Sequence, residues 1–187
     1  MSDSTCAYIC IILFSADEIV ITTGWDASYL NDTELIKIGS NGNIIATPTK
    51  CKLPNYPLSL YGAKGIFLSE SNSNIICGGG NYDKKTATNK CHQFNSNSMS
   101  WNEVNPLKIA RYYHAITSIG QSLVTCGGWT ASKQELSSCE IMINGNGQWT
   151  TMKPLPIKLA AHCMVEMDPS KIVSLGGYDG RVRKNKR

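Results

Sequence analysis

The chain of 187 residues has the length of one domain, or of a run of repeats that share a core, and 42% of its residues are hydrophobic. Its net charge of +4 depends on residues 181–187, which hold five basic side chains, because the remainder has thirteen basic and fourteen acidic residues. No basic stripe with interleaved aromatic residues runs through the body of the chain, so we expect no nucleic-acid binding. Residues 181–187 are expected to form a solvated basic tail, with binding to an anionic partner as the alternative.

The first apolar run, residues 7–14, is predicted to be a β-strand and not a signal peptide. No basic residue precedes it, two acidic residues follow it closely, and it is too short to span a bilayer. Residues 9–26 also align without a gap with residues 162–179 near the C-terminus. This alignment pairs Cys10 with Cys163, so we expect the run to belong to a repeat and the protein to have no membrane segment.

A glycine pair returns every 49 residues, as Gly78-Gly79, Gly127-Gly128 and Gly176-Gly177. Other residues recur at a spacing of 48: Trp101 and Trp149, Pro106-Leu107 and Pro154-Leu155, Cys91 and Cys139, and His114 and His162. A repeat of this length fits one four-stranded propeller blade.

Each copy contains short apolar runs separated by Gly, Asn, Ser and Pro, which predicts an all-β protein. In the most complete copy, strands are expected at residues 114–119, 123–127, 139–143 and 148–152. Gly120-Gln121 is expected to form the first hairpin turn. The glycine pairs would permit a bend or a close backbone approach. The tryptophans would fill the wedge between blades, and the histidines are expected to be hydrogen-bonded packing residues.

The copies predict a propeller arc over residues 6–180, followed by the tail 181–187. The three four-stranded blades are expected at residues 6–54, 58–105 and 109–155, and two strands of a fourth at 159–178. The first copy departs most from the pattern. It keeps only Thr23-Gly24 of the glycine pair, has Lys52 in place of tryptophan, and aligns Gly65 with the histidines.

Four of the eight cysteines occupy two repeat positions, Cys77 with Cys126 and Cys91 with Cys139. Other copies place non-cysteine residues there, which favours small buried positions, so we expect reduced thiols and a cytoplasmic protein. The alternative is that Cys77 bonds to Cys91, and Cys126 to Cys139, across neighbouring antiparallel strands. That alternative fits an oxidising compartment.

The order of these landmarks resembles the kelch repeat. The second copy carries the pattern most fully, in the order Ile75-Ile76-Cys77-Gly78-Gly79, Phe94, Trp101, Pro106-Leu107 and Arg111-Tyr112-Tyr113-His114. The resemblance covers almost the whole chain and implies a kelch-type β-propeller. Kelch propellers characteristically have five to seven blades, so this arc is incomplete. It is expected to be a fragment of a longer protein, a truncated product without function, or an open arc completed by a second chain.

The resemblance also implies a protein-binding scaffold whose loops between blades bind a partner protein or peptide. We expect Arg111, at a position where the family frequently uses arginine, to contact the partner together with Tyr112 and Tyr113. The alternative is that Arg111 only tethers neighbouring loops. Trp129 is a weaker candidate, because its loop and the Lys84-Lys85 loop are expected on the opposite rim or at the periphery. Substrate recruitment to a ubiquitin ligase and actin binding are roles that the family allows.

No catalytic or metal-binding group stands out, and no cofactor is expected. The three histidines and the absence of C-x-x-C and H-E-x-x-H patterns argue against a metal site. The alternative is a carbohydrate-active or galactose-oxidase-like propeller fragment. Because the open arc leaves strand edges unpaired, self-association is also expected.

Overall fold

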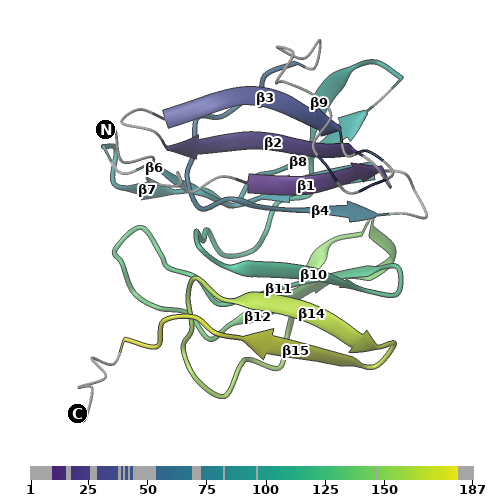
Figure 1. Cartoon of the computed structure of the whole chain (residues 1–187). Coiled ribbons are helices and arrows are strands. Elements are labelled where there is room, and N and C mark those ends of the chain that lie inside the picture. The colour runs from purple at the N-terminus through teal and green to yellow at the C-terminus, as the bar shows by residue number, and fades with distance from the viewer. Residues whose placement is uncertain are drawn as a thin grey trace.

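The computed structural model of the chain consists of antiparallel sheets that follow one another along the sequence (Figure 1). The structure describes residues 10–15, 18–25, 29–37, 39, 41, 43, 54–68, 73–81, 83–95, 97–145 and 147–180. Residues 44–53 near the end of the expected first blade, and the basic tail at 181–187, lie outside the described residues.

The strands form three larger sheets, a strand pair and a small hairpin. They are β1 (Cys10–Ser15), β2 (Glu18–Trp25), β3 (Tyr29–Lys37), β4 (Lys64–Leu68), β5 (Ser73–Cys77), β6 (Gly80–Asn81), β7 (Thr86–Ala87), β8 (Cys91–Asn95), β9 (Ser100–Val104), β10 (Ala115–Ile119), β11 (Ser122–Cys126), β12 (Cys139–Met142), β13 (Trp149–Met152), β14 (Cys163–Asp168) and β15 (Lys171–Leu175). Apart from the 3-10 turn η1 (Ile143–Gly145), the described residues contain no helix. The prediction of an all-β chain is confirmed.

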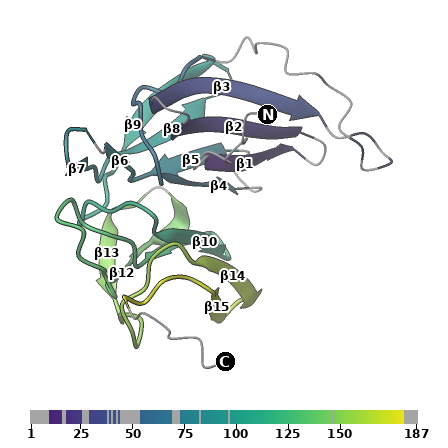
Figure 2. The same ribbon diagram turned by 60° about the vertical axis from the view of Figure 1, so that its left-hand side comes forward.

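We name the sheets by their order in the chain. The first blade is β1-β2-β3, the second is β4-β5-β8-β9, the third is β10-β11-β12-β13, and the half-blade is β14-β15. Figures 1 and 2 show the sheets in chain order from one end of the molecule to the other, with the inner strands β1, β4, β10 and β14 as neighbours. The chain therefore forms an incomplete propeller. The hairpin β6-β7, which the sequence analysis did not predict, projects from the loop after β5.

The strand register identifies equivalent positions in the blades. Cys10 pairs with Thr22 in the first blade, and Cys163 pairs with Leu175 in the half-blade. These pairs have the same spacing, so the predicted alignment of residues 9–26 with 162–179 is confirmed. The two-residue hairpin turn at Gly120-Gln121 is also present between β10 and β11.

The register corrects the alignment of Gly65 with the histidines. Lys64 pairs with Cys77 as Ala115 pairs with Cys126, so Ala63 occupies the position of His114. The sequence alignment missed this because the connection between β4 and β5 is two residues longer than the turn between β10 and β11. An undetected insertion in a hairpin shifts every residue before it.

The tryptophans lie where neighbouring blades meet. Trp149 is 1% exposed, and its indole N–H donates to the carbonyl oxygen of Asn105 at 3.1 Å. Trp101 donates in the same way to Pro54 at 3.1 Å. One apolar cluster joins the second and third blades and contains Leu68, Ile75, Cys77, Cys91, Leu107, Leu123, Met142 and Trp149. The large rings therefore pack in the interior between blades and are not free for a ligand.

The expectation of reduced thiols is wrong for the four repeated cysteines. Disulfides join Cys77 to Cys91 and Cys126 to Cys139, with 4.1 Å between the Cα atoms in each pair. The register places each pair directly opposite on adjacent strands, so the bridges connect the second and third strands of both complete blades. Among the described cysteines, Cys163 is free and exposed.

Candidate functional site

The glycine pairs lie against the histidine of the next blade. A Cβ atom on Gly78 would lie 2.7 Å from Cε1 of His114, and one on Gly127 would lie 2.8 Å from Cε1 of His162. A Cβ on Gly127 would also overlap the carbonyl oxygen of Leu159. Both glycines have φ near +66°, at 65° and 67°, which L side chains rarely adopt. The first glycine of each pair is therefore required for two reasons: its backbone has a positive φ, and the next blade leaves no room for a side chain.

The two histidines are buried and neutral. Burial lowers the pKa of His114 well below its usual value, and burial together with the charge of Lys64 lowers the pKa of His162 to about 4. None of their ring nitrogens has a hydrogen-bond partner among the described residues. This corrects the expectation of hydrogen-bonded histidines: the rings pack against the glycines of the preceding blade.

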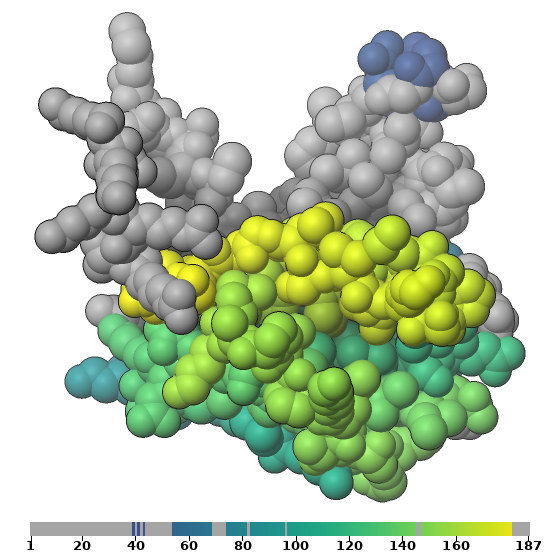
Figure 3. Space-filling model, turned by 90° about the horizontal axis from the view of Figure 1, so that it is seen from below, coloured from purple at the N-terminus to yellow at the C-terminus, as the bar shows by residue number. Residues whose placement is uncertain are grey.

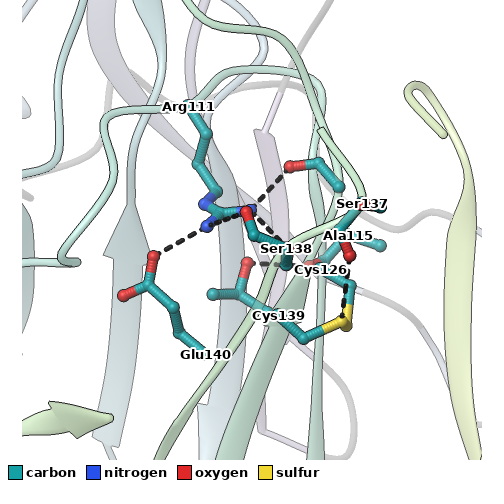
Figure 4. The surroundings of a disulfide bond; sticks show 9 residues. Arg111, Ala115, Cys126, Ser137, Ser138, Cys139 and Glu140 are labelled. Carbon is teal, nitrogen blue, oxygen red and sulfur yellow. Dashed lines mark hydrogen bonds and ion pairs between the residues drawn. A yellow bond between two sulfur atoms is a disulfide. The ribbon is translucent and has the colours of Figure 1, made fainter. Parts of the chain in front are cut away.

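Arg111 lies in the interior between the second and third blades (Figure 4). Its Nη1 donates to the carbonyl oxygens of Gly127 at 2.8 Å and Ser138 at 3.0 Å. Its Nη2 donates to Ser138 Oγ at 3.1 Å and forms an ion pair of 2.7 Å with Glu140. The carbonyl oxygen of Arg111 accepts the N–H of Gly79 at 2.9 Å, so this residue connects the two blades.

The carboxylate of Glu140 also accepts hydrogen bonds from the backbone. Besides Arg111, its carboxylate accepts the backbone N–H groups of Lys108 at 2.6 Å and Ile109 at 3.1 Å. Burial lowers the pKa of Arg111 and the carboxylate of Glu140 raises it, and a guanidinium stays charged at neutral pH. The side chains of Arg111 and Glu140 are 0% and 1% exposed.

The burial of Arg111 contradicts its expected contact with a partner. A side chain with no exposed surface and four internal hydrogen bonds cannot reach a partner unless the blade rearranges. The tethering alternative describes its position. Replacement of Arg111 is accordingly expected to destabilise the blade.

The second blade has no ion pair at the position of Arg111 and Glu140 and uses different residues there. Leu60 and His92 occupy the positions of Arg111 and Glu140. The hydroxyl of Tyr56 hydrogen-bonds to Nδ1 of His92 at 2.9 Å, and burial lowers the pKa of His92. Pro57, which has no N–H, replaces the Lys108 donor. The second blade therefore lacks the arginine, the carboxylate that pairs with it, and one of the N–H groups that donate to that carboxylate.

The other predicted contact residues do lie together. Five aromatic side chains form a continuous row that we call the aromatic surface: Tyr61, Tyr112, Tyr113, Trp129 and Tyr178. Neighbouring ring centroids are 5.3 to 5.9 Å apart, within the range of favourable aromatic pairs. Tyr112 is mostly buried, whereas Tyr178 is 46% exposed. The row runs from the second blade to the half-blade.

Backbone pairing explains why this row forms. Tyr112 pairs with Trp129 by reciprocal N–H to carbonyl hydrogen bonds of 3.0 and 2.8 Å, and Ala160 pairs with Tyr178 in the same way. Trp129 therefore lies on the same side as Tyr112 and Tyr113. The predicted placement of the Trp129 loop on the opposite rim is wrong, because the chain segment before each inner strand folds back onto the residues after the glycine pair.

Tyr113 has an unusual backbone conformation. Its φ is 52°, in the left-handed region, where the second blade has Gly62 with φ 63° and the half-blade has Ala161 with φ 51°. Its N–H donates to the carbonyl of Gly62, and its own carbonyl accepts the N–H of Ala161, both at 2.8 Å. A bulky side chain in this region costs about 1 kcal/mol or more, and such residues concentrate at functional sites.

A cleft of about 270 Å³ adjoins the aromatic surface. Its lining residues are Tyr61, Asn81, Lys85, Thr86, Tyr112, Ala131, Ser132 and Lys133. The cleft lies between the β6-β7 hairpin and the loop after Trp129, so the Lys84-Lys85 loop is also on the side of Tyr112 and not on an opposite rim. Burial raises the pKa of Tyr112, and a hydrogen bond to Tyr61 counteracts this. Apolar rings with a few polar groups at the edge suit a peptide segment.

Two aromatic residues and the cleft were missed in the sequence. Tyr61 corresponds to Tyr112, but the insertion between β4 and β5 concealed the match. Tyr178 occupies the position of Trp129 in the half-blade. The cleft had no sequence signal, because it depends on how the two loops fold. No cluster of three or more metal-ligating side chains occurs in the part of the chain that the structure describes.

Comparison with known proteins agrees with this architecture. The family described as Kelch motif matches residues 110–156, which span the third blade and the Arg111 segment. The chain carries kelch repeats. Kelch-like protein 34 of Homo sapiens is 27% identical over 99 residues, which cover 53% of this chain and 15% of that protein. The kelch chain thus corresponds to a small part of this relative's length. In the described residues of the kelch arc, no helix has the length and apolar character needed to cross a bilayer.

Proposed function

We propose that this kelch arc is a protein-binding module and that the aromatic surface is where it binds a partner protein or peptide. The observation that carries the proposal is the row of five aromatic side chains, which spans three successive sheets. Trp129 is partly exposed to solvent and Tyr178 is exposed. Aromatic residues are enriched among the side chains that dominate binding energy, because they bury a large area and lose little conformational entropy.

The cleft supports the proposal because it offers an adjoining depression. Tyr61 and Tyr112 supply its apolar wall, while Lys85 and Thr86 lie at its border. Lys85 is exposed and its φ of 50° holds the loop in a tight turn. A partner that lays an apolar side chain on the rings could place a polar group in this cleft.

We further propose that the chain is not an enzyme.

More specific cellular roles are also proposed for this module. The kelch relationship supports interaction with another protein, and substrate recruitment to a ubiquitin ligase or binding of actin would each use such a surface. The cytoplasmic location was inferred from reduced thiols, and the two disulfides argue against it because disulfides seldom persist in reducing compartments.

The proposal is tested with peptides selected from a random phage-displayed library on the intact chain. The double variant Tyr113→Ala and Trp129→Ala should bind the selected peptides at least about tenfold more weakly, measured by fluorescence anisotropy. Ile143→Ala is the matched control, since Ile143 is 58% exposed and lies in η1, away from the row. Unchanged affinity in the folded double variant would overturn the proposal.

A further inference from the structure

The cleft beside the aromatic surface is formed by one loop from each of two successive blades. One side is the β6-β7 hairpin of the second blade, and the other is the loop at residues 130–134 of the third blade. No described residue of the half-blade lines it, and the strands β14 and β15 form the yellow-green and yellow surface in Figure 3. The cleft therefore belongs to the two blades whose four strands are all described.

Each of these loops has a lysine with a left-handed backbone at the same place. In the β6-β7 hairpin, Lys85 directly precedes the residue that closes the loop and has φ 50°. In the other loop, Lys133 has φ 59° and directly precedes Gln134, whose carbonyl oxygen accepts the N–H of Thr130 at 3.0 Å. Glycine adopts this conformation freely, whereas a lysine there costs about 1 kcal/mol or more. Such costly conformations concentrate at functional sites, which favours a role for both lysines.

The described lining of the cleft is positively charged. Lys85 and Lys133 both line it, both are exposed, and the described lining residues include no carboxylate. Asp83 is exposed on the same hairpin but is not one of these lining residues. Two positive charges at one concave site raise the local potential and attract an anion.

The other polar lining residues are suited to the same kind of group. Tyr61, Thr86, Tyr112 and Ser132 contribute hydroxyl groups, which donate hydrogen bonds to anions. Burial raises the pKa of Tyr112, so its phenol stays protonated at neutral pH. The cleft volume of about 270 Å³ lies below the range of about 300–1,000 Å³ that is typical of small-molecule sites. The cleft therefore suits one side chain of a partner better than a whole small molecule.

The opposite charge lies farther along the aromatic surface. Glu135 pairs with Trp129 and is not one of the described lining residues of the cleft. A Cβ atom on Gly180 would lie 3.5 Å from Oε1 of Glu135, so this carboxylate lies toward the half-blade. A partner that follows the row thus meets two lysines at one end and a carboxylate farther along. Complementary charges of this kind determine the direction in which a partner binds.

We infer that the cleft binds an anionic side chain of a partner peptide, next to an apolar side chain that lies on the aromatic surface. Lys85 and Lys133 supply the positive charge, and their compact ammonium groups donate to a carboxylate or a phosphate in several geometries. The inference rests on the proposed function and adds the chemistry of the partner, which is a segment with an acidic or phosphorylated residue.

The first test uses the peptides that are selected on the intact chain from the random phage-displayed library. Selected peptides that need Tyr113 and Trp129 should be enriched in Asp and Glu relative to the unselected library. The tightest of them is synthesised with Gln in place of each acidic residue in turn, and fluorescence anisotropy measures the Kd. One of these replacements should weaken binding at least about fivefold, because it removes the charge that the cleft binds.

The second test asks whether the two lysines are responsible. Lys85→Gln combined with Lys133→Gln should weaken binding of the acidic peptide at least about fivefold. It should weaken the Gln-substituted peptide much less, because both changes remove the same ion pairs. Lys153→Gln is the matched control, since Lys153 is an exposed lysine directly after β13. If the double variant does not fold, Lys85→Gln alone takes its place.

A phosphoserine at the essential acidic position distinguishes the two sources of the anion. Tighter binding than with the acidic residue assigns the cleft to a phosphorylated partner, and weaker binding assigns it to a carboxylate.

The outcomes separate this inference from the proposed function. Peptides that need Tyr113 and Trp129 but have no essential acidic residue overturn the inference and leave the proposed function standing. The same holds if the acidic residue does not couple to Lys85 and Lys133. A selection that yields no binders, or binders that do not need Tyr113 and Trp129, contradicts both.

Discussion

The third blade and the half-blade share a strand register but differ in burial. Cys126 is 4% exposed in the third blade, whereas Leu175, at the same position, is 53% exposed in the half-blade. The sequence pattern therefore decides which residues share a face, and the neighbouring sheet decides whether that face leaves water. A kelch blade is a unit that cannot bury its apolar surface alone, as expected for repeat proteins.

The two regions also differ in their internal connections. The third blade has the disulfide between Cys126 and Cys139 and the ion pair between Arg111 and Glu140. In the half-blade, Leu159 and Leu175 occupy the positions of Arg111 and Cys126, and the pair β14-β15 has no third strand among the described residues. In the third blade, both connections reach the third strand β12, which contains Cys139 and Glu140.

The largest expected effect is on the network of Arg111 and Glu140 in the third blade. Arg111→Leu should lower the free energy of unfolding by about 3–5 kcal/mol, because it leaves the carboxylate of Glu140 buried without its cation. Denaturant titration followed by circular dichroism measures this effect.

The second blade provides the matched rescue. Adding Leu107→Tyr, Lys108→Pro and Glu140→His to Arg111→Leu reproduces the Tyr56, Pro57, Leu60 and His92 arrangement in the third blade. This fourfold variant should recover a substantial part of the lost stability. A single Arg111→Leu variant as stable as the parent chain would show that the network does not hold the blade.

A glycine comparison measures the contribution of the neighbouring blade. Gly127 and Gly176 both have φ of 67°, but a Cβ on Gly127 would collide with Leu159 and His162, whereas one on Gly176 would meet nothing within 4 Å. Gly176→Ala should cost only the backbone term, about 1–2 kcal/mol. Gly127→Ala should cost about 2 kcal/mol more, from overpacking. Equal losses in thermal unfolding would mean that the close contact between blades has no energetic weight.

The smallest effect concerns the histidine of the half-blade. The pKa of His162 is about 4 when folded and 6.5 when unfolded, so the unfolded chain binds more protons between these values. Stability should thus fall as pH decreases from about 6.5 to about 4, by at most about 1.4 kcal/mol per pH unit. His162→Gln should remove this part of the pH dependence of denaturant midpoints. A variant with the same pH profile as the parent would contradict the shifted pKa.

Much of the fold could be predicted because the repeat restricts it. The glycine pairs mark the end of each second strand, and the alignment of residues 9–26 with 162–179 located the first blade. The glycine and histidine positions also vary together: the first blade has Thr23 for the first glycine, and the next blade has Ala63 for histidine. A one-chain alignment concealed this coupling, because a two-residue insertion displaced Ala63 from its position.

The candidate site could be predicted only in part. Tyr112, Tyr113 and Trp129 were identified from the repeat and lie together. Arg111 was assigned to the surface because its family position suggested contact, but the sequence did not reveal that Glu140, 29 residues later, lies within reach of it. Burial of a charged side chain depends on such distant partners. Likewise, the disulfides required knowledge of which cysteines lie opposite in the register.

The most direct test of the dependence of each blade on its neighbour is amide hydrogen exchange of the intact chain, read by mass spectrometry in dilute solution. We predict slow exchange in β10 and β11, because the half-blade covers them. Exchange in β14 and β15 should be fast, because Val165 and Leu175 are exposed to solvent. If β14 and β15 exchange as slowly as β10 and β11, a blade does not depend on its neighbour and the account is contradicted.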